Sequence, residues 1–84
     1  MTSGRITLYT RPGCHLCDDA KIVIERVSAA TGAGWTEISI AGDPELEADY
    51  GEMVPVIHLD GRMHGYFRVE EDRLRRDLGH GPTS

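Results

Sequence analysis

Two hydrophobic periodicities follow one another in the N-terminal part of the chain. Residues 5–10 alternate between polar and apolar side chains, which is typical of a half-buried strand. From Cys14 onward the apolar positions recur every three or four residues, and this spacing predicts an amphipathic helix. Its apolar positions are Leu16, Ala20, Val23, Ile24 and Val27. Proline and glycine at residues 11–13 separate the strand from the helix, and the segment 31–34 ends the helix.

The middle of the chain predicts a second strand and a short helix. Alternation over residues 35–40 indicates the strand, and a helical crossover places it parallel to the first strand. We expect Trp35 and Ile38 to belong to the core. Asp43 followed by Pro44 is typical of a helix start, so a helix of about two turns is expected over residues 45–50.

The C-terminal part predicts a hairpin and a final helix. Residues 54–59 indicate a strand, the Asp60-Gly61 pair a tight turn, and residues 62–67 the antiparallel return strand. One ring of the pair Tyr66 and Phe67 should face the sheet core. Residues 69–78 are rich in Glu at their start and Arg towards their end, as a helix dipole prefers.

The predicted order is therefore β-α-β-α-β-β-α, an α/β arrangement with a four-stranded mixed sheet and helices on both of its faces. A chain of 84 residues has room for one domain. We expect this domain to span residues 1–84, with residues 80–84 as a frayed tail.

Composition excludes several classes of function. No apolar run of 18 residues is present, so a membrane span is not expected. Nine basic and fourteen acidic residues give a net charge of −5, which argues against nucleic-acid binding because phosphate neutralisation needs a basic face. The N-terminus lacks the pattern of a secretory signal, so we expect a cytoplasmic protein.

The two cysteines are three residues apart at the predicted helix start. In a chain without a sign of export, such a pair indicates redox or metal chemistry more than a structural staple. Thiols at this spacing on a first helical turn can form a disulfide, and the helix N-terminus favours a thiolate. Cys14 is therefore predicted to be the attacking thiolate and Cys17 the shielded resolving thiol. A structural zinc site is not expected, because no second cysteine pair is present.

Neighbouring charges should shift the pKa of Cys14 in opposite directions. Arg11 precedes it and His15 follows it, and both favour the thiolate form. Asp18 and Asp19 lie in the same first turn and disfavour a nearby anion. We expect the effect of Arg11 and His15 to be the larger, so that the pKa of Cys14 stays below that of a free thiol.

The segment 8–17, with Val54-Pro55 ahead of a strand some forty residues later, resembles glutaredoxins and, more closely, a family of small glutaredoxin-like proteins. The resemblance covers nearly the whole chain and implies a thioredoxin-like fold of glutaredoxin size. It also implies that the Val54–Pro55 bond is cis and lies beside the two sulfurs, where the backbone of Val54 would pair with a bound thiol peptide. Tyr9 and Tyr66 are candidates for lining the same groove.

The sequence departs from glutaredoxins after the hairpin. Where the family places a Gly-Cys-Asp or Gly-Ser-Asp loop for the γ-glutamyl end of glutathione, alignment on Gly61 and Gly65 puts Tyr66-Phe67-Arg68. An arginine has the wrong sign to meet an amino group. The electron donor therefore stays open between glutathione, another low-molecular-weight thiol and a reductase.

The leading hypothesis is a monomeric thiol–disulfide oxidoreductase that reduces protein or low-molecular-weight disulfides without a tightly bound cofactor. Two alternatives stay open. One is an iron–sulfur carrier or scaffold that uses Cys14 in a dimer, and the other is a thioredoxin-fold interaction module with an idle dithiol.

Overall fold

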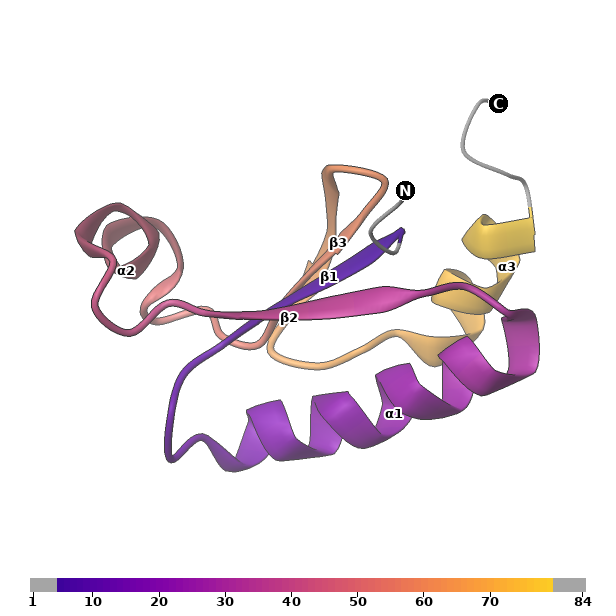
Figure 1. Ribbon diagram of the computed structural model, residues 1–84, viewed down its shortest axis with the longest axis horizontal. Coiled ribbons are helices and arrows are strands. Elements are labelled where there is room, and N and C mark those ends of the chain that lie inside the picture. Colours follow the sequence, from indigo (N-terminus) through magenta and orange to yellow (C-terminus); the bar gives the residue numbers. More distant parts are fainter. Residues whose placement is uncertain (1–4, 80–84) are drawn as a thin grey trace.

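The structure is a computed structural model that describes residues 5–79, and its elements follow the predicted order. They are β1 (Ile6–Thr10), α1 (His15–Thr31), β2 (Trp35–Ser39), α2 (Pro44–Tyr50), β3 (Val56–Leu59), β4 (Arg62–Tyr66) and α3 (Glu71–Gly79). The four strands form one sheet in the order β2-β1-β3-β4 (Figure 1). The β1–β2 pair is parallel, and the β1–β3 and β3–β4 pairs are antiparallel. The mixed thioredoxin-like sheet is therefore confirmed.

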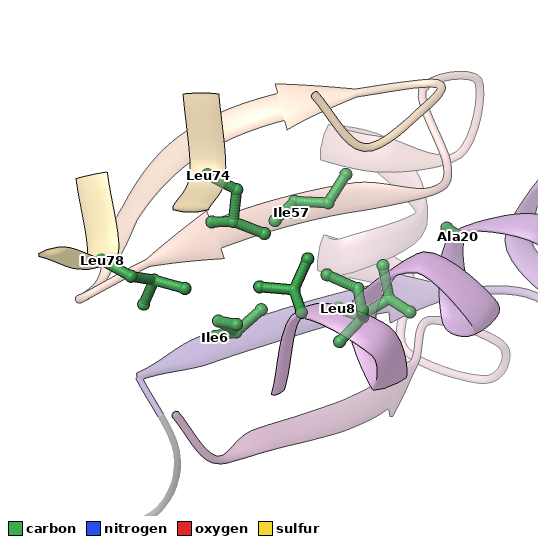
Figure 2. Close-up of a cluster of buried hydrophobic side chains, with 8 residues drawn as sticks. Ile6, Leu8, Ala20, Ile57, Leu74 and Leu78 are labelled. Carbon is green, nitrogen blue, oxygen red and sulfur yellow. The ribbon is translucent and has the colours of Figure 1, made fainter. Parts of the chain in front are cut away.

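The main core lies between one face of the sheet and the helices α1 and α3 (Figure 2). Alternate residues of a strand point to the same face, so Ile6 and Leu8 of β1 and Ile57 of β3 meet the two helices together. The buried cluster consists of Ile6, Leu8, Ala20, Ile24, Val27, Ile57, Leu74 and Leu78. These residues span four elements, which explains why the sheet and both helices form one packed unit.

The opposite face of the sheet carries Tyr9 and His58. The ring of Tyr50, the last residue of α2, lies 5.0 Å from the ring of Tyr9 and 5.8 Å from that of His58. The Tyr50 hydroxyl and His58 Nε2 are 3.2 Å apart, within hydrogen-bond distance. The prediction of helices on both faces is therefore confirmed, and α2 covers only the end of the second face (Figure 1).

Two elements begin two residues later than the sequence-based prediction. Strand β3 begins at Val56 and not at residue 54, because Pro55 has no N–H for a ladder hydrogen bond. Helix α3 begins at Glu71 and not at residue 69.

The two apolar residues of β2 that were expected in the core differ in burial. Trp35 is partly buried against the main core, as predicted. Ile38 is 36% exposed, so its assignment to the core was wrong. It pairs in register with Tyr9, on the face that α1 does not cover.

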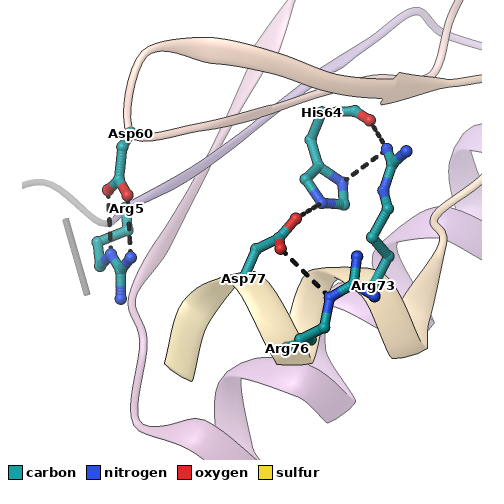
Figure 3. A network of polar contacts seen from close by, with 6 residues as sticks. All are labelled: Arg5, Asp60, His64, Arg73, Arg76 and Asp77. Carbon is teal, nitrogen blue, oxygen red and sulfur yellow. Dashed lines mark hydrogen bonds and ion pairs between the residues drawn. The ribbon is translucent and has the colours of Figure 1, made fainter. Parts of the chain in front are cut away.

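Polar contacts join the hairpin to α3 and to the start of β1 (Figure 3). Asp60 accepts from Arg5, with a shortest distance of 2.9 Å. Nε2 of the partly buried His64 lies 2.8 Å from an Asp77 carboxylate oxygen, and Arg73 contacts both Nδ1 and the carbonyl of His64. Contacts at both ring nitrogens therefore hold His64 between β4 and α3.

Helices α1 and α3 are joined by a shared carboxylate. Glu71 accepts from Arg26 at 2.7 Å and from Arg75 at 3.1 Å. The hydrogen bond from Arg26 is the main cause that lowers the pKa of Glu71 from about 4.5 to about 2.

No helix within residues 5–79 combines the length and the apolar character needed to cross a bilayer.

A matched pair of isoleucines on α1 tests the core. Ile24 is fully buried and Ile22 is 59% exposed. We expect Ile24→Ala to lower the free energy of unfolding by about 2–5 kcal/mol, because it leaves a cavity. Ile22→Ala should change it by less than about 0.5 kcal/mol. Urea denaturation of both variants measures the difference, and equal losses would contradict this packing.

The shared carboxylate predicts a pH dependence of stability. A carboxyl group whose pKa is lowered by folding stabilises the fold above its unfolded pKa, and this contribution disappears as the pH falls through the folded value. The contribution of Glu71 should therefore be complete above about pH 4.5 and lost towards pH 2. Urea titrations over this range should show a smaller loss of stability for Glu71→Gln than for the wild type. Glu25→Gln, at an exposed position of α1, should retain the wild-type profile.

Candidate functional site: a dithiol at the start of helix α1

Cys14 is the N-cap of α1. Its backbone is extended, with φ −98° and ψ 112°, and its Sγ accepts a hydrogen bond of 3.3 Å from the N–H of Cys17. Its carbonyl accepts the first helical bond, from the N–H of Asp18 at 3.2 Å. Gly13 has a φ of +78°, which lets the chain turn from the loop into the helix. The helix therefore begins at His15, one residue later than predicted, and the sulfur of Cys14 satisfies one of its free N–H groups.

Cys17 lies behind Cys14 and is only 2% exposed. It forms a buried cluster with Ile40 and Val54, against which Cys14 also packs. Burial raises the pKa of Cys17 to about 11, and the hydrogen bond with Cys14 adds to this shift. A contact with the backbone of Arg11 opposes it. Cys17 is therefore a protonated thiol at neutral pH, whereas Cys14 is partly accessible; both are free cysteines in the structure.

A cleft of about 300 Å³ opens beside Cys17, on the side of β2. The hydroxyl of the buried Thr10 donates to the Glu37 carboxylate at 2.7 Å, and Lys21 Nζ lies 3.4 Å from the same oxygen. The sequence analysis did not identify Thr10, Lys21 and Glu37. A signal was present, because Thr10 is a polar residue on the face of β1 that otherwise holds Ile6 and Leu8.

The Val54–Pro55 segment lies where the family resemblance implied. The bond is cis, and Val54 is in the same buried cluster as Cys17. Tyr9 packs against this cluster and contacts the rings of Tyr50 and His58, each at 5.0 Å. Cys14, Cys17, Val54 and Tyr9 are therefore brought together at one end of the sheet.

The pair Tyr66 and Phe67 differs from expectation, because neither ring faces the core. Both residues are 47% exposed, and their rings pack edge to face at 4.9 Å. Phe67 has a φ of +71°, and its N–H donates to the carbonyls of Pro55 and Met53. This left-handed residue ends the strand and turns both rings outward, beside the Val54–Pro55 segment.

His15 and Arg11, the two residues predicted to lower the pKa of Cys14, lie in different surroundings. His15 is the exposed first residue of α1. The guanidinium of Arg11 donates to the carbonyl of Gly51 at 3.1 Å, so it links the dithiol loop to the end of α2. Their influence on Cys14 stays a prediction. Within residues 5–79, no group of three or more His, Cys, Asp or Glu side chains is arranged to hold a metal ion.

Comparison with known families decides the relationship. The family described as "Glutaredoxin-like domain (DUF836)" matches residues 5–79. The chain belongs to this glutaredoxin-like family. Proteins of Mycobacterium tuberculosis and Mycobacterium bovis, both described as uncharacterised, are 35% identical over 83 residues, a match that covers 93% of this chain and 86% of each relative.

Solved structures support the same family and fold. The crystal structure of protein XcR50 from X. campestris is 35% identical, with a TM-score of 0.73, and the match covers 92% of this chain and 99% of that one. Protein Ne2328 from Nitrosomonas europaea has a TM-score of 0.76 at 20% identity, over 92% of this chain and 93% of its own. The holo form of glutaredoxin C1 from Populus tremula x tremuloides has a TM-score of 0.58 at 18% identity, over 93% and 75%. The last two show the shared fold alone.

The unequal environments of the two thiols predict unequal alkylation. With limiting iodoacetamide at pH 7, the reduced glutaredoxin-like protein should be modified at Cys14, because Cys17 is buried and protonated. Peptide mass spectrometry identifies the site. In Cys14→Ser, alkylation of Cys17 should be slow at pH 7 and should accelerate about tenfold per pH unit in alkaline solution, as its thiolate fraction rises. Preferential modification of Cys17 in the wild type would contradict the assignment.

Proposed function

We propose that this glutaredoxin-like protein is a thiol–disulfide oxidoreductase that reduces disulfides through a Cys14–Cys17 cycle. One observation carries the proposal: the sulfur of Cys14 caps α1 and is accessible, while Cys17 is buried directly behind it. Helix N–H groups stabilise a sulfur anion. The arrangement therefore supports an attacking thiolate with a protected partner, and family membership supports the same role.

The first step is attack by Cys14. Its thiolate forms a bond to one sulfur of the substrate disulfide, and the other substrate sulfur leaves as a thiolate that takes a proton from solvent. The product is a mixed disulfide between Cys14 and the substrate. The capping N–H of Cys17 stabilises the anion before the attack, when the negative charge is on Cys14.

Resolution by Cys17 completes the cycle. Cys17 loses its proton to solvent and attacks Cys14 Sγ, so that the second substrate thiol leaves and a Cys14–Cys17 disulfide forms. The substrate gains two electrons and the protein loses two. Burial, the largest cause of the raised pKa of Cys17, keeps the share of molecules that hold this thiolate small at neutral pH. An external dithiol, glutathione or a reductase then returns the two electrons.

Groups beside the sulfurs support binding of an extended thiol segment. Val54 lies in the buried cluster of the dithiol, and Tyr9 packs against the same cluster. We propose that the backbone of Val54 pairs with the substrate segment and that Tyr9 and Tyr66 line its path. Pro55 was expected to contribute to this surface, but its side chain is fully buried and cannot contact the segment. The cytoplasmic location and the monomeric state expected from the sequence fit this role and stay predictions.

Single-cysteine variants test the cycle. Cys14→Ser should abolish disulfide reduction, because no accessible thiolate remains. Cys17→Ser should still attack and should accumulate a mixed disulfide, detected as a mass increase equal to one half of the substrate. Equal activity of the two variants would exclude the proposed roles.

A second assay identifies the electron donor. Oxidised wild-type protein is offered either a flavin-dependent thioredoxin reductase or glutathione with its reductase, and the system that reduces the disulfide is the donor.

A further inference from the structure

The charges of this chain are segregated along the sequence and in space. No Lys or Arg occurs between Arg26 and Arg62, whereas seven carboxylates do: Glu37, Asp43, Glu45, Glu47, Asp49, Glu52 and Asp60. Five of them lie in residues 43–52, on α2 and its two ends. We refer to residues 43–52 as the acidic lobe. Its five negative charges equal the net charge of −5 of the whole chain.

Ion pairs neutralise several carboxylates elsewhere but none of those of the acidic lobe; Asp18, Asp19, Glu25 and Asp72 are the other carboxylates without an ion pair among residues 5–79. The cations with a carboxylate partner are Arg5, Lys21, Arg26, Arg68, Arg75 and Arg76, and their partners all lie outside residues 43–52. Among the residues that the structure describes, no salt bridge involves the acidic lobe. Its field therefore acts on the surroundings, with a range of about 8 Å at physiological salt.

The acidic lobe lies beside the accessible thiol. Leu46 and Tyr50 of α2 pack on the same buried cluster as Cys14, and the guanidinium of Arg11 contacts the carbonyl of Gly51. In Figure 1, α2 and the start of α1 occupy the same end of the molecule. Asp49 and Glu52, on either side of Gly51, are therefore the carboxylates next to the contact with the dithiol loop.

An exposed apolar surface borders the same site. The exposed rings of Tyr66 and Phe67 pack edge to face, and the N–H of Phe67 donates to the carbonyl of Pro55. Leu16, two residues after Cys14, is half exposed. A disulfide that reaches Cys14 thus meets apolar side chains together with unpaired negative charge.

We propose that the protein recognises polypeptide disulfides whose cysteine is flanked by lysine or arginine and by an apolar residue. The inference rests on the proposed redox function and specifies its substrate class. The basic residues would face the acidic lobe, and the apolar residue would pack on Tyr66 and Phe67. A second copy of the chain is a poor occupant, because two acidic lobes would face each other with like charge.

The first test measures the field at Cys14 without requiring enzyme activity. In Cys17→Ser, the rates of reaction with a cationic trimethylammonium methanethiosulfonate and with its anionic sulfonate analogue are each divided by the rate with β-mercaptoethanol. At low ionic strength the cationic reagent should be favoured about tenfold. The preference should nearly vanish in about 1 M salt, because screening then acts within about 3 Å.

The second test uses substrates of the proposed class. Two disulfide peptides are compared that differ only in having Lys or Glu beside the cysteine, with a common leucine on the other side. Reduced wild-type protein should react about tenfold faster with the Lys peptide at low salt. Phe67→Gly should raise the KM for both peptides several-fold with little change in kcat, since glycine adopts the same positive φ without strain.

Matched variants assign the effect to the acidic lobe. Asp49→Asn with Glu52→Gln removes two charges at the C-terminal end of α2, where carboxylates oppose the helix dipole, so folding should be unaffected. This double variant should lower both preferences several-fold. Glu25→Gln with Asp72→Asn removes two charges from α1 and α3 and should leave both preferences unchanged.

Several outcomes would overturn the proposal. They are equal rates with the two reagents, equal or faster reaction with the Glu peptide, and an equal loss of preference in the control variant. A reagent rate that falls with protein concentration would indicate that a second copy covers the site. If the reagents show the charge preference but neither peptide is reduced, the redox function itself fails, and the substrate assignment with it. Reduction of both peptides at one rate would retain the redox function and reject only the assignment.

Discussion

The hydrogen bond from the N–H of Cys17 to the sulfur of Cys14 is the contact on which the organisation of the site depends. It requires the chain to leave β1, turn through Gly13 and enter α1 within a few residues. The same geometry leaves Cys14 accessible and buries Cys17 in the cluster with Ile40 and Val54. One local constraint therefore gives the two sulfurs different solvation, which is the physical basis of their different chemistry.

The two faces of the sheet contribute differently to the position of this hydrogen bond. The aliphatic core under α1 and α3 fixes the direction of α1, and so the position of its first turn. On the other face, α2 covers only one end, where Tyr50 meets Tyr9 and His58. Stability thus lies mostly with the first face. The second face leaves apolar and acidic side chains available around the dithiol.

The order of elements was predictable because each has a strong local signal, such as the stripe of α1 or the Asp60-Gly61 turn. The dithiol at a helix start followed from the position of Cys14 after a strand and a Pro-Gly pair. The inward position of Thr10 could have been inferred from the alternation in β1, but its partner Glu37 could not, because that contact depends on the register between β1 and β2. The outward rings of Tyr66 and Phe67 were missed because a positive φ at a bulky residue has no sequence signal.

At Phe67 the backbone holds the turn, and the ring is not needed for it. An aromatic residue in this conformation costs roughly 1–2 kcal/mol that glycine would not, and the hydrogen bonds that hold the turn come from its backbone N–H. The ring is therefore dispensable for the turn. If the proposed substrate class holds, a single substitution at residue 67 would change the preferred substrate while the sheet and the thiols beside it stay in place.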